Sequence, residues 1–296
     1  MTTPPTPQAP SQRQAPAQRQ APAPQHSPQT APAGPYTSPI PVRRATLGDA
    51  IASEWTKIRS VRSTMWTLGV MIVLLIGIGL LAALVVNTVD SDLGSTPVLS
   101  LGFFGVLLGS ICVITLGVMT IASEYGTGMI RTTLTACPSR ARVLGAKAIV
   151  FFLLTFVITT VTTALVAVLQ TALIDGAAPS GGEWLQATVG VGLYIATLGL
   201  LSLAVGAIIR HSAGAITIMI GVVLLPLVLA MFMFTDSLAD LRLALFQYSI
   251  PSQLSAFYST SVAESGPSGW DPLWIMLGTA AVAMFCAFVT LDRRDV

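Results

Sequence analysis

The sequence is poor in charged side chains. Asp, Glu, Lys and Arg make up 9% of its 296 residues, whereas 53% are hydrophobic. Soluble domains carry about 25% charged residues, and a chain this apolar has more hydrophobic surface than one aqueous core can bury. We therefore expect a membrane protein. The 15 basic and 13 acidic residues leave a formal net charge of +2, which disfavours nucleic acid as a partner.

Residues for several kinds of chemistry are also scarce. The three cysteines lie far apart, with Cys112 and Cys286 in apolar runs and Cys137 in a basic loop, so no disulfide framework is expected. The two histidines, His26 and His211, do not provide a haem or zinc site. The sequence also lacks the GxxxxGK[ST] phosphate-binding motif. We expect no catalytic, metal or cofactor site in this chain, and no ATP hydrolysis of its own.

Residues 1–45 have the composition of a disordered tail. They are rich in Pro, Gln and Ala, with 12 of the 19 prolines before residue 42, and they contain no acidic residue. Such a segment has too few apolar side chains to form a core. It also lacks the apolar stretch of a cleavable secretory signal. We predict a disordered cytoplasmic extension followed by one membrane domain, residues 46–296.

Six long runs without Asp, Glu, Lys, Arg or His follow the tail. About 20 apolar residues are needed for a helix to cross the hydrocarbon, and continuous runs favour helices over the alternating strands of a barrel. Small residues four apart, such as Gly105 and Gly109, predict close contacts between helices. The expected fold is all-α and polytopic, with spans at about residues 66–86, 98–121, 148–174, 184–209, 213–235 and 272–291.

The basic residues predict the orientation of these spans. If the amino terminus is cytoplasmic, every Lys and Arg except Arg242 lies on the cytoplasmic side, as the positive-inside rule requires. Both termini are then cytoplasmic, and we expect a bacterial plasma membrane as the location. The absence of charge within the spans disfavours an ion-coupled carrier, which needs a polar relay at mid-membrane.

Residues 46–63 are predicted to form an amphipathic helix in the membrane surface. Thr46 and Asp49 have the spacing of an amino-terminal capping pair, and apolar residues recur every three or four positions. The basic and aromatic side chains suit the headgroup layer. The alternative is an extension of the first span with snorkelling basic residues. The candidate interfacial residues are Trp55, Lys57, Arg59 and Arg62.

The segment between the second and third spans, residues 122–148, is too long for a tight turn. Glu124 lies at its membrane edge, residues 129–135 are predicted to form a short helix, and Pro138 should end that helix. Ser139 is then expected to cap a second helix. The basic side chains of that helix, Arg140, Arg142 and Lys147, are expected to face lipid headgroups or a partner. A solvated basic connector is the alternative.

Two cytoplasmic segments carry a resemblance to a known family. ASEWTKIRSVRSTMWTL (52–68) and IASEYGTGMIRTTLTACPSRARVLGAKAIV (121–150) resemble the membrane subunit of type-2 ATP-binding-cassette exporters. This resemblance implies that residues 46–63 form an elbow helix, that residues 236–270 contain short outer helices, and that residues 124–135 hold a coupling helix that docks on an ATPase. The residues assigned to coupling are Glu124, Tyr125, Gly126, Thr127, Arg131 and Thr132.

The resemblance also implies a function. It predicts the permease subunit of an ATP-driven exporter, coupled through residues 122–148 to a separate cytosolic ATP-binding-cassette ATPase. Half of such a translocator is one six-span bundle, so the expected assembly includes a second permease copy, as a homodimer in the lipid bilayer. The uncharged spans favour an amphipathic substrate, such as a drug, lipid or hydrophobic peptide. The alternative is a membrane assembly or sensor protein without transport.

Overall fold

The computed structural model describes residues 46–89, 96–174, 176–260 and 266–293. All of them belong to one compact unit, Arg44–Val296. Helices joined by short loops make up these ranges, and no strand occurs within them. The predicted tail, residues 1–45, lies outside the described residues, and so that prediction stays open.

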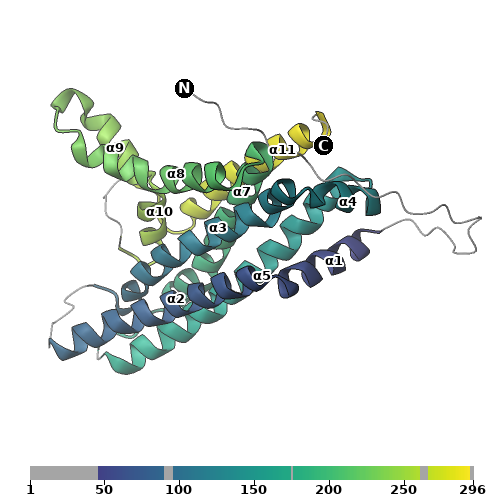
Figure 1. Ribbon diagram of the computed structural model, residues 1–296. Helices are drawn as coiled ribbons and strands as arrows, with labels where there is room; N and C mark the ends of the chain where they lie inside the picture. The colour runs from purple at the N-terminus through teal and green to yellow at the C-terminus, as the bar shows by residue number, and fades with distance from the viewer. Residues whose placement is uncertain (1–45, 90–95, 175, 261–265, 294–296) are drawn as a thin grey trace, which may run out of the picture. The chain divides into compact units, whose positions relative to one another are not determined.

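Six helices of the described chain are long and apolar enough to cross a membrane, which confirms the predicted all-α, six-span architecture (Figure 1). Two of these spans begin with short helical segments. The 3-10 helix η1 (Val98–Gly102) precedes α3. The short helix α6 (Gly181–Leu185) and the π-helical segment η2 (Gln186–Gly190) precede α7. The spanning helices are α2 (Arg62–Thr88), α3 (Phe103–Thr127), α5 (Arg140–Leu173), α7 (Val191–Ile209), α8 (Ser212–Phe232) and α11 (Asp271–Arg293).

Helix α7 is the most enclosed of the six. The span that contains it buries 67% of its most apolar stretch, compared with 22% for α2 and 17% for α11. It packs against α3, α5 and α11. A Cβ added at Gly117 of α3 would lie 2.6 Å from the carbonyl oxygen of Gly199 on α7. Only a residue without a side chain allows these two backbones to come so close.

The small residues singled out in the sequence also lie at helix contacts. A Cβ at Gly105 would lie 2.9 Å from the carbonyl oxygen of Leu75 on α2, and one at Gly109 would meet the side chain of the same leucine. The prediction of close helix packing at these positions is confirmed.

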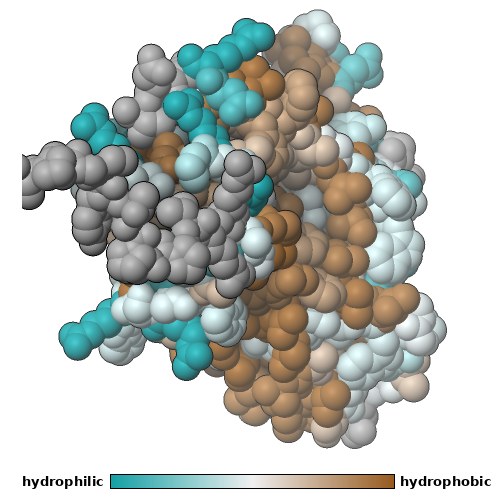
Figure 2. Space-filling model, turned by 90° about the vertical axis from the view of Figure 1, so that its right-hand side faces the viewer, coloured by the Kyte–Doolittle hydropathy of each residue, from teal (hydrophilic) through white to brown (hydrophobic). Residues whose placement is uncertain are grey.

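Apolar side chains are also abundant on the outside of the bundle. Val73 of α2, Phe232 of α8 and Phe285 of α11 are all more than 60% exposed. Figure 2 shows apolar side chains over a broad area of one face, with many of the hydrophilic ones gathered at its margin. Exposed apolar surface on this scale would favour aggregation in water. In a bilayer, the same side chains would contact the apolar acyl chains of the lipids.

Helix ends follow the capping patterns in the sequence. Helix α1 (Leu47–Ser60) starts with a capping box in which Thr46 and Asp49 each accept a hydrogen bond from the other's backbone N–H. Ser139 caps α5 by accepting from the Arg142 N–H. The short helix α4 (Met129–Ala136) ends just before Ser139. It follows a left-handed turn at Gly128 (φ 72°), which a glycine adopts without strain. All three predictions are confirmed.

Short helices also follow α8, where the resemblance implied them. They are η3 (Asp236–Leu238), α9 (Ala239–Gln247) and α10 (Ile250–Ala256). Helix α10 packs against α8 and α3. Phe257, directly after α10, packs against Tyr194 of α7 and Trp270, with ring centroids 5.5 Å and 6.3 Å away. Aromatic contacts therefore hold this connection against the central helix.

Candidate functional site

Four charged side chains from three helices meet at one end of the bundle. Glu54 and Lys57 come from α1, Glu124 from the last turn of α3, and Lys147 from the second turn of α5. We call these four residues the ionic cluster. Thr133 of α4 borders it. The cluster therefore joins two segments that lie far apart in the sequence, residues 46–63 and 122–148.

Lys147 is the buried centre of the cluster. Its Nζ donates to Glu54 Oε2 at 2.8 Å, to Glu124 Oε1 at 2.6 Å and to the carbonyl oxygen of Thr120 at 3.3 Å. The Lys147 side chain is only 1% exposed. Three acceptors thus match the three N–H donors of an ammonium group.

Lys57 closes the cluster from the outside. Its Nζ lies 2.7 Å from Glu54 Oε1 and 2.9 Å from Glu124 Oε1, and it donates to Thr133 Oγ1 at 3.4 Å. Burial acts to lower the pKa of Lys57, but the hydrogen bonds and charges of Glu54 and Glu124 outweigh it and raise the pKa above the ordinary lysine value. Lys57 is therefore a cation throughout the neutral pH range.

The charges of the cluster cancel. Each carboxylate contacts both lysines, so two negative and two positive charges form a closed ring. Buried charges are tolerated when they are paired and hydrogen-bonded, and removing one partner costs about 3–5 kcal/mol because the other charge stays buried. The cluster therefore fixes the relative positions of α1, α3 and α5 strongly.

The length of α5 accounts for the position of Lys147. The helix has 34 residues, and at about 1.5 Å per residue Lys147 lies about 40 Å from its outer end. The hydrocarbon layer is about 30 Å thick. The part of α5 that follows Lys147 is thus long enough by itself to cross the hydrocarbon, and the charge of Lys147 contacts protein.

Helix α4 presents two different faces. Ile130 is buried and Thr133 approaches the cluster, whereas Met129, Arg131 and Thr132 are exposed. The amphipathic spacing explains this division, since residues 130 and 133 lie one turn apart on one side. The outward face of α4 is thus available to a partner, and its inward face contacts the cluster.

The predicted coupling residues fall into different environments. Arg131 and Thr132 lie on the exposed face of α4, and Gly126 and Thr127 are exposed in the turn before it. Glu124 is buried in the cluster. Tyr125 is half-buried, with the guanidinium carbon of Arg210 4.8 Å from its ring centroid. Only part of this set can therefore contact another protein directly.

The predicted interfacial residues separate in the same way. Trp55, Arg59 and Arg62 are exposed, whereas Lys57 is turned inward. Helix α1 contacts Lys147 near the amino-terminal end of α5, and Gly79 of α2 accepts from Gln170 near its carboxyl-terminal end. Helices α1 and α2 thus follow one another along α5, with a break at Val61. Both the interfacial helix and the alternative of an extended first span stay predictions.

Sequence reasoning missed two members of the cluster. Lys147 was expected to face headgroups or a partner, but it is buried, because Glu54 and Glu124 reach it from other helices. Glu54 was assigned no role. One signal was present: Glu54 and Ile58 are one helical turn apart, so both lie on the buried side of α1.

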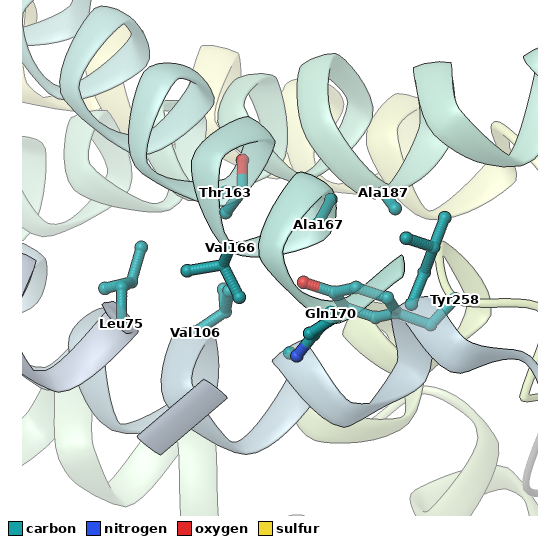
Figure 3. A pocket seen from close by; sticks show the side chains of 10 residues that line it. Leu75, Val106, Thr163, Val166, Ala167, Gln170, Ala187 and Tyr258 are labelled. Carbon is teal, nitrogen blue, oxygen red and sulfur yellow. The ribbon is translucent and has the colours of Figure 1, made fainter. Parts of the chain in front are cut away.

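A second polar site lies toward the other end of α5. It is a cavity of about 10 Å³ between α2, η1, α3, α5 and η2, where Figure 3 shows Gln170 and Tyr258 side by side. Gln170 Nε2 donates to the carbonyl oxygen of Gly79 at 3.1 Å. The volume is about that of one water molecule, so this cavity does not hold a substrate in this conformation.

In the described ranges, no three His, Cys, Asp or Glu side chains group to hold a metal ion.

Comparison with known protein families decides the class of this membrane domain. A family model described as ABC-2 family transporter protein matches residues 50–247, more than half of the chain. The chain belongs to this family. A search among curated proteins found no match. The match begins in α1, ends with α9 and includes the whole ionic cluster.

Family membership gives this ABC-2 chain a permease role in transport and confirms the resemblance drawn from residues 52–68 and 121–150. It favours transport over the alternative of a membrane assembly or sensor protein. With its six apolar helices, the ABC-2 protein is a multi-pass membrane protein. Permeases of this family normally work with an ATPase subunit.

Proposed function

We propose that this ABC-2 protein is the membrane-spanning permease subunit of an ATP-driven exporter, coupled through residues 122–148 to a separate cytosolic ATPase. The observation that carries the proposal is the ionic cluster, which joins α1, α3 and α5 directly beside α4. A protein that pushes on α4 would therefore act on the inner ends of two spanning helices at once.

The exposed face of α4 is the proposed contact with the ATPase. Arg131 supplies a positive charge there, and Met129 supplies an apolar side chain that is 49% exposed. The inward residues Ile130 and Thr133 hold α4 against the bundle. Motion of α4 would pass to Glu124 through Thr133 Oγ1, 3.5 Å from Glu124 Oε2, and then to Lys147 on α5. Glu124 thus belongs to the transmitting side of the site and not to the docking face.

The proposed assembly has two permease copies and two ATPase copies in the plasma membrane of a bacterium, with both permease termini in the cytoplasm. Helices α2, α8 and α11 are the least covered spans, which leaves surface for a second copy as well as for lipid. The translocation path would form between the copies. An amphipathic substrate suits such a path, because no charged side chain lies in the middle of the spans.

Co-purification tests the coupling assignment. The tagged chain, extracted from native membranes in mild detergent, should bring with it a cytosolic protein that hydrolyses ATP. Replacing an exposed arginine at an interface costs about 1–2 kcal/mol, so Arg131→Ala should lower the recovered ATPase activity about tenfold. Arg242→Ala on α9 is the matched control, because this arginine is also exposed and lies on the proposed outer side.

Two results would overturn the proposal. One is an unchanged yield of ATPase activity with Arg131→Ala while the protein inserts normally. The other is a partner that co-purifies without hydrolysing ATP, which would support the alternative of an assembly or sensor protein.

A further inference from the structure

The outward surface at the junction of α1 and α2 carries two arginines between two tryptophans. Trp55 is 44% and Trp66 is 76% exposed, and Arg59 and Arg62 between them are exposed as well. We call these four residues the Arg–Trp surface. Its members recur at spacings of three or four residues, although the break at Val61 separates α1 from α2. Trp66 in particular leaves most of its surface uncovered by the bundle.

The Arg–Trp surface is purely positive. The only acid between residues 50 and 66 is Glu54, which is 4% exposed and bound to Lys57 and Lys147 on the opposite side of α1. In the described part of the chain, neither Arg59 nor Arg62 takes part in an ion pair. The ionic cluster thus removes the one negative charge that would otherwise neutralise this surface.

The surface also lies at the depth of the lipid headgroups. Arg62 is the first residue of α2, and the apolar residues of the first span begin at Met65, after Ser63 and Thr64. An arginine at the end of a spanning helix extends toward the membrane boundary, and tryptophan is enriched at that boundary. Trp66 is about 6 Å farther into the membrane than Arg62, and Trp55 about 10 Å farther out, at about 1.5 Å per residue. The four side chains therefore cover about the thickness of one headgroup layer.

We infer that the Arg–Trp surface binds the phosphate groups of anionic phospholipids in the leaflet that α1 faces. A guanidinium group forms paired hydrogen bonds with phosphate, and a lipid with net negative charge is attracted further by two unpaired cations. The flanking tryptophan rings hold the glycerol region.

Lipid binding to the purified full-length chain tests this inference without any ATPase, so its outcome is independent of the proposed coupling. The delipidated protein in neutral detergent would be titrated with phosphatidylglycerol and with phosphatidylcholine, and bound lipid counted by native mass spectrometry. Each basic residue near an anionic surface contributes about a fivefold preference, so Arg59→Gln/Arg62→Gln should reduce the preference for phosphatidylglycerol about 30-fold. Added salt should reduce the preference of the unmodified chain.

Matched controls separate this surface from general positive charge. Arg131→Gln and Arg242→Gln remove other exposed arginines and should leave the preference unchanged. Arg59→Lys/Arg62→Lys keeps the charge and should retain part of it. An unchanged preference in Arg59→Gln/Arg62→Gln would overturn the inference. An equal loss in Arg131→Gln would overturn it too.

Discussion

Replacing Lys147 by methionine is the most direct test of the ionic cluster. Methionine keeps an unbranched side chain of similar length but removes the ammonium group that donates to Glu54, Glu124 and the Thr120 carbonyl oxygen. The cluster would then hold two buried carboxylates and one lysine, with a net charge of −1. Leaving a buried charge without its partner costs about 3–5 kcal/mol. We expect Lys147→Met to lower the free energy of unfolding by about that amount.

A second substitution makes the test specific. Glu54→Gln in the Lys147→Met background restores a neutral cluster, because Lys57 and Glu124 remain paired at 2.9 Å. We therefore expect the double variant to be more stable than Lys147→Met alone, with a coupling energy of about 1–3 kcal/mol. Arg59→Gln, an exposed residue on the other side of α1, should change stability by about 0.5 kcal/mol or less.

Unfolding in mixed micelles with increasing sodium dodecyl sulfate, followed by tryptophan fluorescence, measures these differences. If Lys147→Met is as stable as Arg59→Gln, the cluster does not stabilise the fold. If the effects of Lys147→Met and Glu54→Gln simply add, the two side chains do not interact as the structure indicates.

Two further predictions concern helix contact and pH. Gly117→Ala should destabilise the chain by about 1–3 kcal/mol because its Cβ would lie 2.6 Å from the Gly199 carbonyl oxygen. Gly77→Ala is the control, because a Cβ there would have no atom within 4 Å. Equal stabilities of the two variants would contradict the prediction. The stability difference between the unmodified chain and Lys57→Met should be constant from neutral pH up to the ordinary lysine pKa of about 10.4. This difference should shrink as pH rises through the raised pKa of folded Lys57. If unfolding titrations show that the difference has already disappeared at about pH 8, the pKa of Lys57 is not raised.

Local patterns allowed much of the fold to be predicted. The six spans follow from uncharged runs long enough to cross the bilayer. The capping box at Thr46, the cap at Ser139 and the short helix before Pro138 were also predicted, because each depends on residues a few positions apart. Predictions based on such short spacings hold because helix ends must satisfy their own backbone groups.

The candidate site was only partly predicted. Glu124 and Lys57 were named, but for separate roles in a coupling loop and an interfacial helix, whereas the structure pairs them at 2.9 Å. Spacing along one helix shows which residues share a face. It does not show which other helix that face meets, and so the burial of Lys147 could not be derived from its own neighbours.

The amino-acid sequence by itself determined that this protein is a helical membrane protein, where its spans lie and which end of each short helix is capped, since hydrophobicity and capping act locally. Tertiary structure alone decided that Glu54, Lys57, Glu124 and Lys147 form one neutral cluster. These residues are up to 93 positions apart, and only helix packing brings their charges within 3 Å, where pairing offsets the cost of removing them from water.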